Sequence, residues 1–462
     1  LFSADEKISI PGAKLSSVTL PNKIFEKALK GLLLTNSTES KYAPIDFRSL
    51  SVREFGTIYE GLLMSELSIA ESDLTTNKKG ELLPAKEKDK ISINKGEIYL
   101  HDRSGVRKSS GSYFTKDFAV EYLLDTVLEP ALKKHLDQLD QLPDSEKSKK
   151  IFQFRLADIA MGSGHFLVAA IDRIEKSFSH WLENNPLAEV SRELDYLRNT
   201  AKNELGDLAH FGVIEDAQLL RRLIARRCIY GIDLNPITVQ LARLSIWIHT
   251  FVPGLPLSLL DRNLVCGNSL IGVGSLDDIR RKFDQSSGTL FEIDTDQIIG
   301  KAKEPLKKLA LLSDATIKDI EEGRSLINDA NLKIKDTKAL CDLIIAQTIS
   351  EKPKLKGYQF EDWERLKDDV LDSEIYKEAK EELKEYNPLH FPVSFPEVFI
   401  DNSQGFNVVL GNPPWQEVTV EEDAFWARYF PGLGGMSQKD QESKKESLRE
   451  SSPDLVKEFE KE

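Results

Sequence analysis

The chain has 462 residues, of which 40% are hydrophobic and 30% are charged. It is therefore long enough for two or three folded units and has the composition of a soluble globular protein. A formal net charge of −14 argues against a uniformly basic, nucleic-acid-binding surface, although Arg103, Arg107, Lys108 and Lys116 form a local basic stretch or a solvated loop. The longest weakly polar run, Leu244–Leu260, contains a histidine, two prolines and a glycine, which indicates a buried segment and not a membrane span.

The ends and the cysteines of the chain indicate where the protein works. The sequence begins at Leu1 and not at methionine, and no secretory signal is recognisable, so we expect a fragment of a cytoplasmic protein. Its three cysteines, Cys228, Cys266 and Cys341, are far apart and form neither a metal-ligand spacing nor a disulfide framework. This cysteine usage fits a reducing compartment and predicts no metal site.

The first part of the chain is predicted to be mainly helical over residues 1–100, because apolar side chains recur at helical spacing from Phe55 to Leu67. Within this region, Ile91–Leu100 alternates apolar and polar residues, which predicts a strand or a hairpin. An amphipathic helix is expected over Asp117–Leu139, beginning near Thr115 and broken or kinked at Pro130.

Residues 101–275 alternate short strands with helices, a pattern typical of a doubly wound α/β sheet. The strands are predicted over Phe152–Ile159, Cys228–Ile232 and a segment closing at Val265–Leu270. Between the first two, Asp172–Arg222 is expected to form an additional helical excursion.

The last part of the chain is predicted to return to this sheet after an insertion. Residues 276–386 are rich in Lys, Glu and Asp at helical periodicity, which predicts a helical insertion with a solvated charged face. Over residues 387–462, the strand pattern resumes at Phe395–Ile400 and Phe406–Leu410. After Trp415 the sequence is polar and predicted to be helical to its end.

A glycine loop follows the first predicted strand of the sheet. In the run Asp158-Ile159-Ala160-Met161-Gly162-Ser163-Gly164, glycines allow a ligand to approach the backbone closely, and the following helix presents N–H groups at its first turn. The run does not match the dinucleotide pattern G-x-G-x-x-G, since the third glycine is missing. A cofactor without phosphates, such as S-adenosylmethionine, fits this loop at least as well.

Polar residues also follow the next two predicted strands. Asp233 ends the second predicted strand of the sheet, where a carboxylate suits the two hydroxyls of a ribose. The alternative is that it serves as the N-cap of the next helix. Asn268 closes the third strand, where it could meet an adenine edge or act as a plain turn residue. Both positions are expected at the carboxyl edge of the sheet.

The run Asn412-Pro413-Pro414-Trp415 follows the last predicted strand and suggests a specific chemistry. The exocyclic amine of a nucleobase is a poor nucleophile, because its lone pair is conjugated into the ring. An Asn side-chain oxygen and a proline carbonyl can accept from that amine, the two prolines stiffen the turn, and Trp415 offers a face for a base outside its duplex. The alternative is an ordinary Pro-Pro turn followed by a core tryptophan.

The glycine loop, the polar residues after the next two strands and the Asn412–Trp415 run together resemble the amino-group DNA methyltransferases that use S-adenosylmethionine and make N6-methyladenine. Two further segments, near Phe55–Leu63 and Phe391–Phe399, are similar to the large Eco57I-like restriction–modification and phage-defence enzymes. The resemblance covers about residues 50–275 and 385–460. It rests on the following motifs in chain order: Gly111-Ser112-Tyr113-Phe114-Thr115, Asp158–Leu167, Asp233–Pro236, Gly267-Asn268-Ser269 and Asn412–Trp415.

The resemblance implies a Rossmann-like methyltransferase sheet and a role for each motif. The cofactor S-adenosylmethionine would be bound at its methionine part by Thr115, Ala160, Gly162 and Gly164, with Asp158 supporting the loop. Asp233 would bind the ribose, Leu234 would pack on the adenine, and Asn268 would contact the adenine edge. Asn412 and Pro413 would bind the target amine, and Pro414 and Trp415 would complete the catalytic loop.

The resemblance further implies an adenine-specific DNA methyltransferase that acts on double-stranded DNA with a flipped adenine. Three residues depart from the usual motifs of the family: Met161, Ile159 and Lys116. In this family about three more strands and a recognition domain follow the catalytic loop, so the sheet in this chain is expected to be incomplete. Nuclease and specificity domains or subunits would lie outside this chain. A protein glutamine N5-methyltransferase and a non-catalytic DNA- or partner-binding module are the alternative functions.

Overall fold

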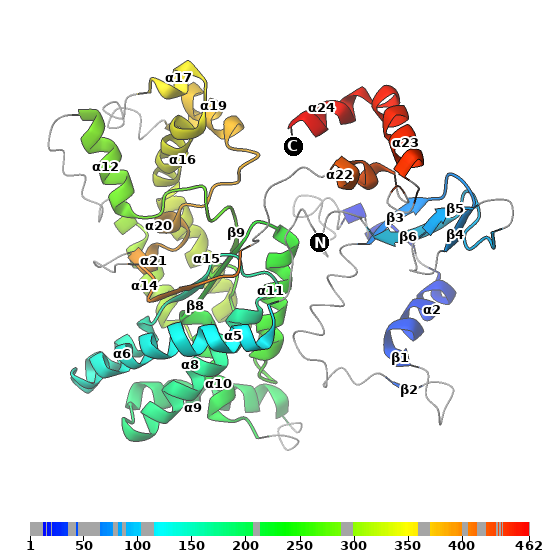
Figure 1. Cartoon of the computed structure of the whole chain (residues 1–462). Coiled ribbons are helices and arrows are strands. Elements are labelled where there is room, and N and C mark those ends of the chain that lie inside the picture. The colour runs from blue at the N-terminus through cyan, green and yellow to red at the C-terminus, as the bar shows by residue number, and fades with distance from the viewer. Residues whose placement is uncertain are drawn as a thin grey trace. The chain divides into compact units, whose positions relative to one another are not determined.

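A computed structural model describes most of the chain between residues 115 and 413 and shorter segments on either side (Figure 1). The chain divides into two compact units, residues 1–55 and 56–462, which are described separately. The described residues are 13–14, 16–19, 21–35, 43–44, 65–76, 82–85, 89–102, 115–206, 213–287, 299–358, 370–399, 405–413, 422–430, 433, 436 and 438–461.

In the first unit, the described residues include helix α2 and one small strand pair. Helix α2 spans Asn22–Leu33. Strand β1 (Leu34–Thr35) follows it directly and pairs antiparallel with β2 (Ala43–Pro44). The predicted helical face from Phe55 to Leu63 lies outside the described residues.

The second unit begins with two antiparallel strand pairs, β3 (Ser65–Ile69) with β6 (Ile98–Asp102) and β4 (Leu74–Thr76) with β5 (Leu82–Pro84). The prediction of a mainly helical region over residues 1–100 is therefore wrong from residue 65 onward, and Leu67 lies in β3 opposite Leu100. Short runs rich in Ser, Thr and Ile between turn residues favour strands over helix. The strand expected near Ile91–Leu100 is confirmed at its end by β6.

The centre of the second unit is a parallel sheet of four strands, in the order β10-β7-β8-β9. The α/β prediction is confirmed at this level. Because β8 and β9 lie on one side of β7 and β10 on the other, the direction of winding reverses beside β7, and ligands of open α/β sheets bind at such a point. The strands are β7 (Leu156–Asp158), β8 (Ile229–Asp233), β9 (Leu264–Cys266) and β10 (Val408–Leu410).

Both faces of this sheet are covered. On one face, the Tyr230 ring meets Phe395 and Phe406 edge-on, at centroid distances of 5.2 and 5.3 Å. On the other face, Gly231 lies so close to α8 (His165–Asn184) that an added Cβ would come within 2.9 Å of Leu167. Strands buried on both sides explain why β7 and β8 are almost continuously apolar.

The strand predicted over Phe395–Ile400 is wrong. The chain forms the short helix α21 (Pro396–Phe399) there, directly after another short helix, α20 (Phe391–Ser394). Pro392 and Pro396 explain the difference, because proline fits the first turn of a helix but cannot donate to the ladder of a central strand.

The helix expected over Asp117–Leu139 is present and is interrupted before Pro130, as predicted. It consists of α5 (Asp117–Leu123), a π-helical turn (Leu124–Leu128) and α6 (Glu129–Asp140). Pro130 has no N–H to donate, and the N–H of Glu129 reaches back five residues to the Leu124 carbonyl.

Arg173 of α8 ties this interrupted helix to the sheet layer. Its guanidinium bonds Asp125 at 2.7 Å and Glu129 at 2.9 Å, and it also bonds Glu121. Three carboxylates on successive turns thus fix α5 against α8, which places Thr115, two residues before α5, near the carboxyl edge of the sheet.

The helical excursion expected between the first two strands is confirmed. Helix α8 is followed by α9 (Ala188–Leu205) and α10 (Asp216–Arg227), and α11 (Pro236–His249) follows β8. The short helix α7 (Asp144–Lys150) and a 3-10 turn (Ile151–Gln153) precede β7.

The helices expected over residues 276–386 are also present. The segments that precede and follow this insertion lie side by side and are hydrogen-bonded to each other. The N–H groups of Leu389 and Phe391 donate to the carbonyls of Ile271 and Val273, at 2.8 and 2.9 Å. Gly272 has a φ of 152°, and a side chain there would overlap the Leu389 carbonyl. The helices of this insertion are α12 (Leu276–Ser287), α14 (Lys303–Leu311), α15 (Ile317–Lys333), α16 (Lys335–Ile349), α17 (Pro353–Lys356) and α19 (Glu374–Glu382), with a 3-10 turn at Val370–Asp372.

The described C-terminal residues form three helices, as the sequence predicts. These are α22 (Glu422–Tyr429), α23 (Gln438–Ser451) and α24 (Pro453–Lys461), and they share an apolar cluster around Phe425 and Trp426. Within the part of the chain that is described, no helix has the length and apolarity needed to cross a bilayer. The domain boundaries expected near residues 100, 275 and 386 remain predictions.

Gly231→Ala is expected to destabilise the second unit by about 1–3 kcal/mol, because its Cβ would overlap Met161 and lie 2.9 Å from Leu167 and Leu264. Urea unfolding monitored by circular dichroism measures the change. Gly300→Ala is the control, since no atom lies within 4 Å of its added Cβ. Equal unfolding midpoints for the two variants would contradict the packing described for β8.

Candidate functional site

The glycine loop lies at the carboxyl end of β7 and is shaped by hydrogen bonds from its own backbone. The N–H of Ala160 donates to Asp158 Oδ1 at 3.0 Å, and the N–H of Met161 donates to the Ile232 carbonyl at 2.9 Å. Gly162 and Gly164 have φ values of 53° and 84°, which favour glycine over residues with a Cβ. The loop therefore turns sharply and leads directly into α8.

Asp233 links the glycine loop to the end of β8. Its Oδ2 accepts from the N–H of Gly162 at 3.0 Å, and its Oδ1 accepts from the N–H of Asn235 at 2.9 Å. The N-cap of α11 is Asn235, whose Oδ1 accepts from the N–H of Ile237. The alternative that Asp233 serves as this N-cap is wrong, and its partly exposed carboxylate lies beside the glycine loop instead.

Asp158 is a fully buried carboxyl at the bottom of this loop. Burial, together with the negative charge of Asp233, raises its pKa to about 7, against the lowering effect of the Ala160 N–H. Burial likewise raises the pKa of Asp233, while the N–H groups of Asn235 and Gly162 lower it. Two neighbouring carboxylates that resist ionisation form a place where a positive charge is favoured.

Asn268 and Leu234 lie at the same edge of the sheet. Asn268 follows β9, its N–H donates to the Asn387 carbonyl at 2.8 Å, and its Oδ1 accepts from the N–H of Leu270 at 3.0 Å. It thus forms a turn at the expected place. Leu234 is 59% exposed and directly follows Asp233, so an apolar side chain stands open beside the carboxylate.

Asn412 lies on the other side of β7, just after β10. Its Nδ2 donates to Thr115 Oγ1 at 2.9 Å, although 297 residues separate the two in sequence. Gly411 comes so close to β7 that an added Cβ would lie 3.6 Å from Asp158 Oδ1. Pro413 is exposed, and Pro414 and Trp415 lie outside the described residues.

Two further contacts at this edge were not predicted. Ser269 donates to the Ile159 carbonyl at 2.9 Å, which connects the end of β9 to the glycine loop. His165 at the start of α8 lies 3.6 Å from Asp117 at the start of α5. Both residues adjoin predicted motifs, but their partners are distant in sequence and no local pattern identifies them.

The arrangement suits a ligand that carries positive charge and a pair of hydroxyls. Asp158 Oδ2 is buried without a hydrogen-bond partner among the described residues, so an acceptor remains for a cation or a donor. No atom lies within 4 Å of the position that a Cβ of Gly162 would take, which leaves room beside the loop. Among the residues that the structure covers, no group of three or more His, Cys, Asp or Glu side chains could bind a metal.

Comparison with known proteins gives one family and one curated relative. A family model described as Eco57I restriction-modification methylase matches residues 227–459. A protein of Methanocaldococcus jannaschii, described as "Putative type II restriction enzyme and methyltransferase", is 22% identical over 367 residues. That alignment covers 67% of this chain but only 28% of the relative. No solved structure matches the chain.

Asp158→Asn is expected to flatten the pH dependence of stability. The pKa of Asp158 rises from 3.8 to about 7 on folding. The protonated carboxyl therefore contributes to the free energy of unfolding in full below pH 4. This contribution is lost as the pH rises through 7, at up to about 1.4 kcal/mol per pH unit. Urea unfolding of the ligand-free protein at pH 5, 6, 7 and 8 measures this.

The neutral variant should be more stable than the wild type at pH 8, whereas Asp137→Asn, at an exposed position of α6, should leave the pH profile unchanged. Parallel profiles for the wild type and Asp158→Asn would contradict the burial of this carboxyl in the folded state.

Proposed function

Because this chain belongs to the Eco57I restriction-modification methylase family, we propose that it is the adenine-N6 methyltransferase region of a DNA restriction–modification or defence protein, with S-adenosylmethionine as its cofactor. The chain spans 28% of the length of the relative it matches. Nuclease and sequence-recognition functions are therefore proposed to lie in other domains or subunits.

The observation that carries the proposal is the hydrogen bond between Asn412 and Thr115 beside the glycine loop. It joins a residue of the first predicted motif to a residue of the last one, at the point where the sheet reverses its winding. The side chain that we propose binds the methyl acceptor thus lies next to the loop that we propose binds the methyl donor. Proximity of this kind is the main requirement for a direct group transfer.

The residues for the cofactor are proposed from their chemistry at the carboxyl edge. Asp158, with one buried oxygen lacking a partner among the described residues, would face the positively charged methionine part, near Thr115, Ala160 and the two glycines of the loop. Asp233 would accept from the ribose hydroxyls in addition to its two backbone donors. The exposed side chain of Leu234 would cover the adenine, and Asn268 would contact its edge.

The chemistry at the acceptor follows from the orientation of the Asn412 amide. When bound, the cofactor supplies an electrophilic methyl group on a sulfonium. Thr115 accepts from the amide nitrogen of Asn412 at 2.9 Å, which directs the side-chain oxygen away from Thr115. We propose that this oxygen and the Pro413 carbonyl accept from the adenine amine, so that its lone pair turns out of the ring plane.

The substrate is proposed to be double-stranded DNA with one adenine flipped out of the stack. An adenine inside a duplex cannot bring its amine to the Asn412 amide, so the base must leave the stack before transfer. Pro414 and Trp415 are proposed to stiffen the loop and to stack on the flipped base. On transfer, the carbon–sulfur bond breaks, the nitrogen–carbon bond forms, and the amine releases one proton.

Asn412→Ala is expected to lower the rate of methyl transfer at least about a hundredfold, since it removes an acceptor that acts on the amine in the transition state. The complete protein is incubated with duplex DNA and methyl-labelled S-adenosylmethionine, and the DNA is digested to nucleosides. The label should be found in N6-methyladenine. Label in protein instead of DNA, or equal rates for wild type and variant, would contradict the proposed function.

Thr115→Val should lower kcat roughly tenfold or more, because the Asn412 amide loses the acceptor that orients it. Thr115→Ser retains the hydroxyl and should keep most of the rate. Cofactor affinity, measured in parallel by calorimetry, separates two roles of Thr115. A lower affinity with unchanged kcat would mean that Thr115 acts on the cofactor and not through Asn412.

A further inference from the structure

A cavity of about 760 Å³ lies at the amino edge of the central sheet, opposite the proposed catalytic edge. Arg155 directly precedes β7, Asn263 directly precedes β9, and Arg227 is the last residue of α10 before β8. The outer wall comes from α9 and from α14 with its following loop. The volume falls within the range of about 300–1,000 Å³ that is common for small-molecule sites.

The wall of this cavity is positively charged, although the chain as a whole carries −14. Six lining residues are basic and only four are acidic. A charge taken out of water is costly unless an opposite charge accompanies it. The basic residues are Lys149, Arg155, Arg192, Arg226, Arg227 and Arg262, and the acidic residues are Glu189, Glu193, Asp314 and Glu397.

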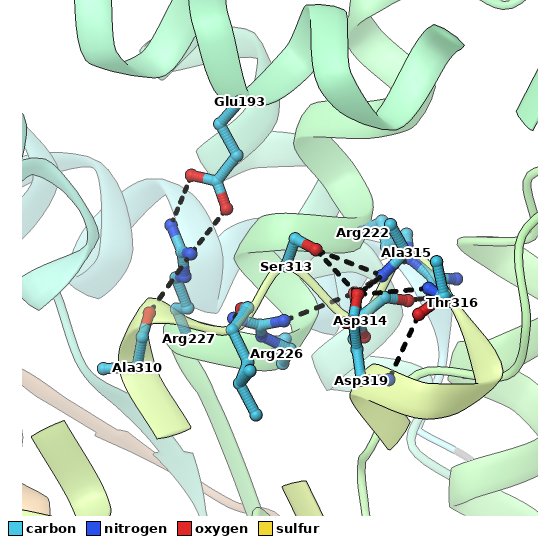
Figure 2. A network of polar contacts seen from close by, with 11 residues as sticks. Glu193, Arg222, Arg226, Arg227, Ala310, Ser313, Asp314, Ala315, Thr316 and Asp319 are labelled. Carbon is cyan, nitrogen blue, oxygen red and sulfur yellow. Dashed lines mark hydrogen bonds and ion pairs between the residues drawn. The ribbon is translucent and has the colours of Figure 1, made fainter. Parts of the chain in front are cut away.

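Arg226 and Arg227 are both paired with carboxylates, although Arg226 shares its partner Asp314 with Arg222, and they serve the structure of the wall (Figure 2). Arg227 binds both oxygens of Glu193, at 2.9 and 2.6 Å, and Arg226 lies 3.3 Å from the buried carboxylate of Asp314. The same two arginines donate to the carbonyls of Ala310 and Leu312. These bonds fasten the helical insertion to α10 and keep the cavity walls in place.

Arg262 is paired in the same way with Glu397, but Arg155 and Arg192 are not. Arg155 donates from Nη1 to the carbonyls of Phe152 and Arg227, at 3.0 and 2.6 Å. Arg192 donates from Nε to the Ala188 carbonyl at 3.1 Å. Within the described ranges neither guanidinium forms an ion pair, so the charges of both can be matched by a bound anion.

The rest of the wall offers flat and apolar surface next to these cations. Tyr196 lines the cavity and is 49% exposed, and Leu311 lines it and is 85% exposed. An aromatic ring and an aliphatic side chain that are open to solvent can cover a planar base. Guanidinium groups bind phosphate oxygens well, because their fixed donors match the spacing of two oxygens of one anion.

We propose that this cavity binds a phosphate-bearing ligand of nucleotide size. Its phosphate would lie toward Arg155 and Arg192, and its base would lie against Tyr196 and Leu311. The ligand would bridge α9 and the insertion, so that binding stabilises the attachment of the insertion to the sheet. This site is separate from the carboxyl edge and does not depend on the methyltransferase proposal.

Calorimetry with ADP as the probe tests the proposal on the folded chain. ADP should bind with a dissociation constant in the micromolar range, inorganic phosphate should compete with it, and adenosine should bind at least roughly tenfold more weakly, since it lacks the charge. Affinity should fall as the salt concentration rises. Saturating S-adenosylhomocysteine should leave ADP binding unchanged, which separates this cavity from the proposed cofactor pocket.

Two variants locate the binding. Arg192→Gln should lower the affinity for ADP about fivefold. Ala310→Trp should block the cavity without changing its charge. The control Lys202→Gln removes one positive charge from α9 outside the cavity and should leave the affinity unchanged. Arg192 is exposed, so Arg192→Gln decides the question even if Ala310→Trp fails to fold.

Three results would overturn the proposal. The first is absence of ADP binding up to millimolar concentration in protein that is folded by circular dichroism. The second is equal affinity in the wild type and Arg192→Gln. The third is displacement of ADP by S-adenosylhomocysteine or by duplex DNA, which would assign the binding to the cofactor pocket or to a DNA surface.

Discussion

The hydrogen bond from the Gly162 N–H to the Asp233 carboxylate is the contact on which the carboxyl edge depends. It joins the loop after β7 to the end of β8, and it requires a backbone turn with a φ of 53° at Gly162. Asp158 and Asp233 are thereby brought close together, and backbone N–H groups offset part of the cost of burying them. The pair retains raised pKa values because the offset is incomplete. Strain of this kind is typical of functional sites.

The two edges of the sheet have opposite charge character. The carboxyl edge carries buried acids beside glycines, and the amino edge carries arginines in excess of their carboxylates. The helical insertion reaches both. The segment that directly follows it, residues 387–391, runs along residues 268–273 near the carboxyl edge, and the insertion's loop around Asp314 is bound by Arg222 and Arg226 at the amino edge. The insertion is therefore part of the sheet's framework and not a detached appendage.

Much of this architecture could be predicted from local sequence pattern. Apolar runs identify β7, β8 and β10, the glycine loop and the Asn412 turn follow them, and proline marks the helix break. The pattern failed at Phe395–Ile400, where apolar residues that suggested a strand belong to the short helix α21, which begins at Pro396. The local sequence pattern could not predict contacts between segments that are distant in sequence. The bond from Asn412 to Thr115, the three acids around Arg173 and the partners of Ser269 all depend on tertiary packing.

We propose that the carboxyl edge binds S-adenosylmethionine through the acids of β7 and β8. The most direct measurement is calorimetric titration of the cofactor into the folded protein and into Asp233→Ala. We expect a dissociation constant in the micromolar range for the wild type, equivalent to about −8 kcal/mol, and an affinity at least roughly tenfold lower in the variant. Unchanged affinity in Asp233→Ala, or no binding by correctly folded complete protein, would contradict it.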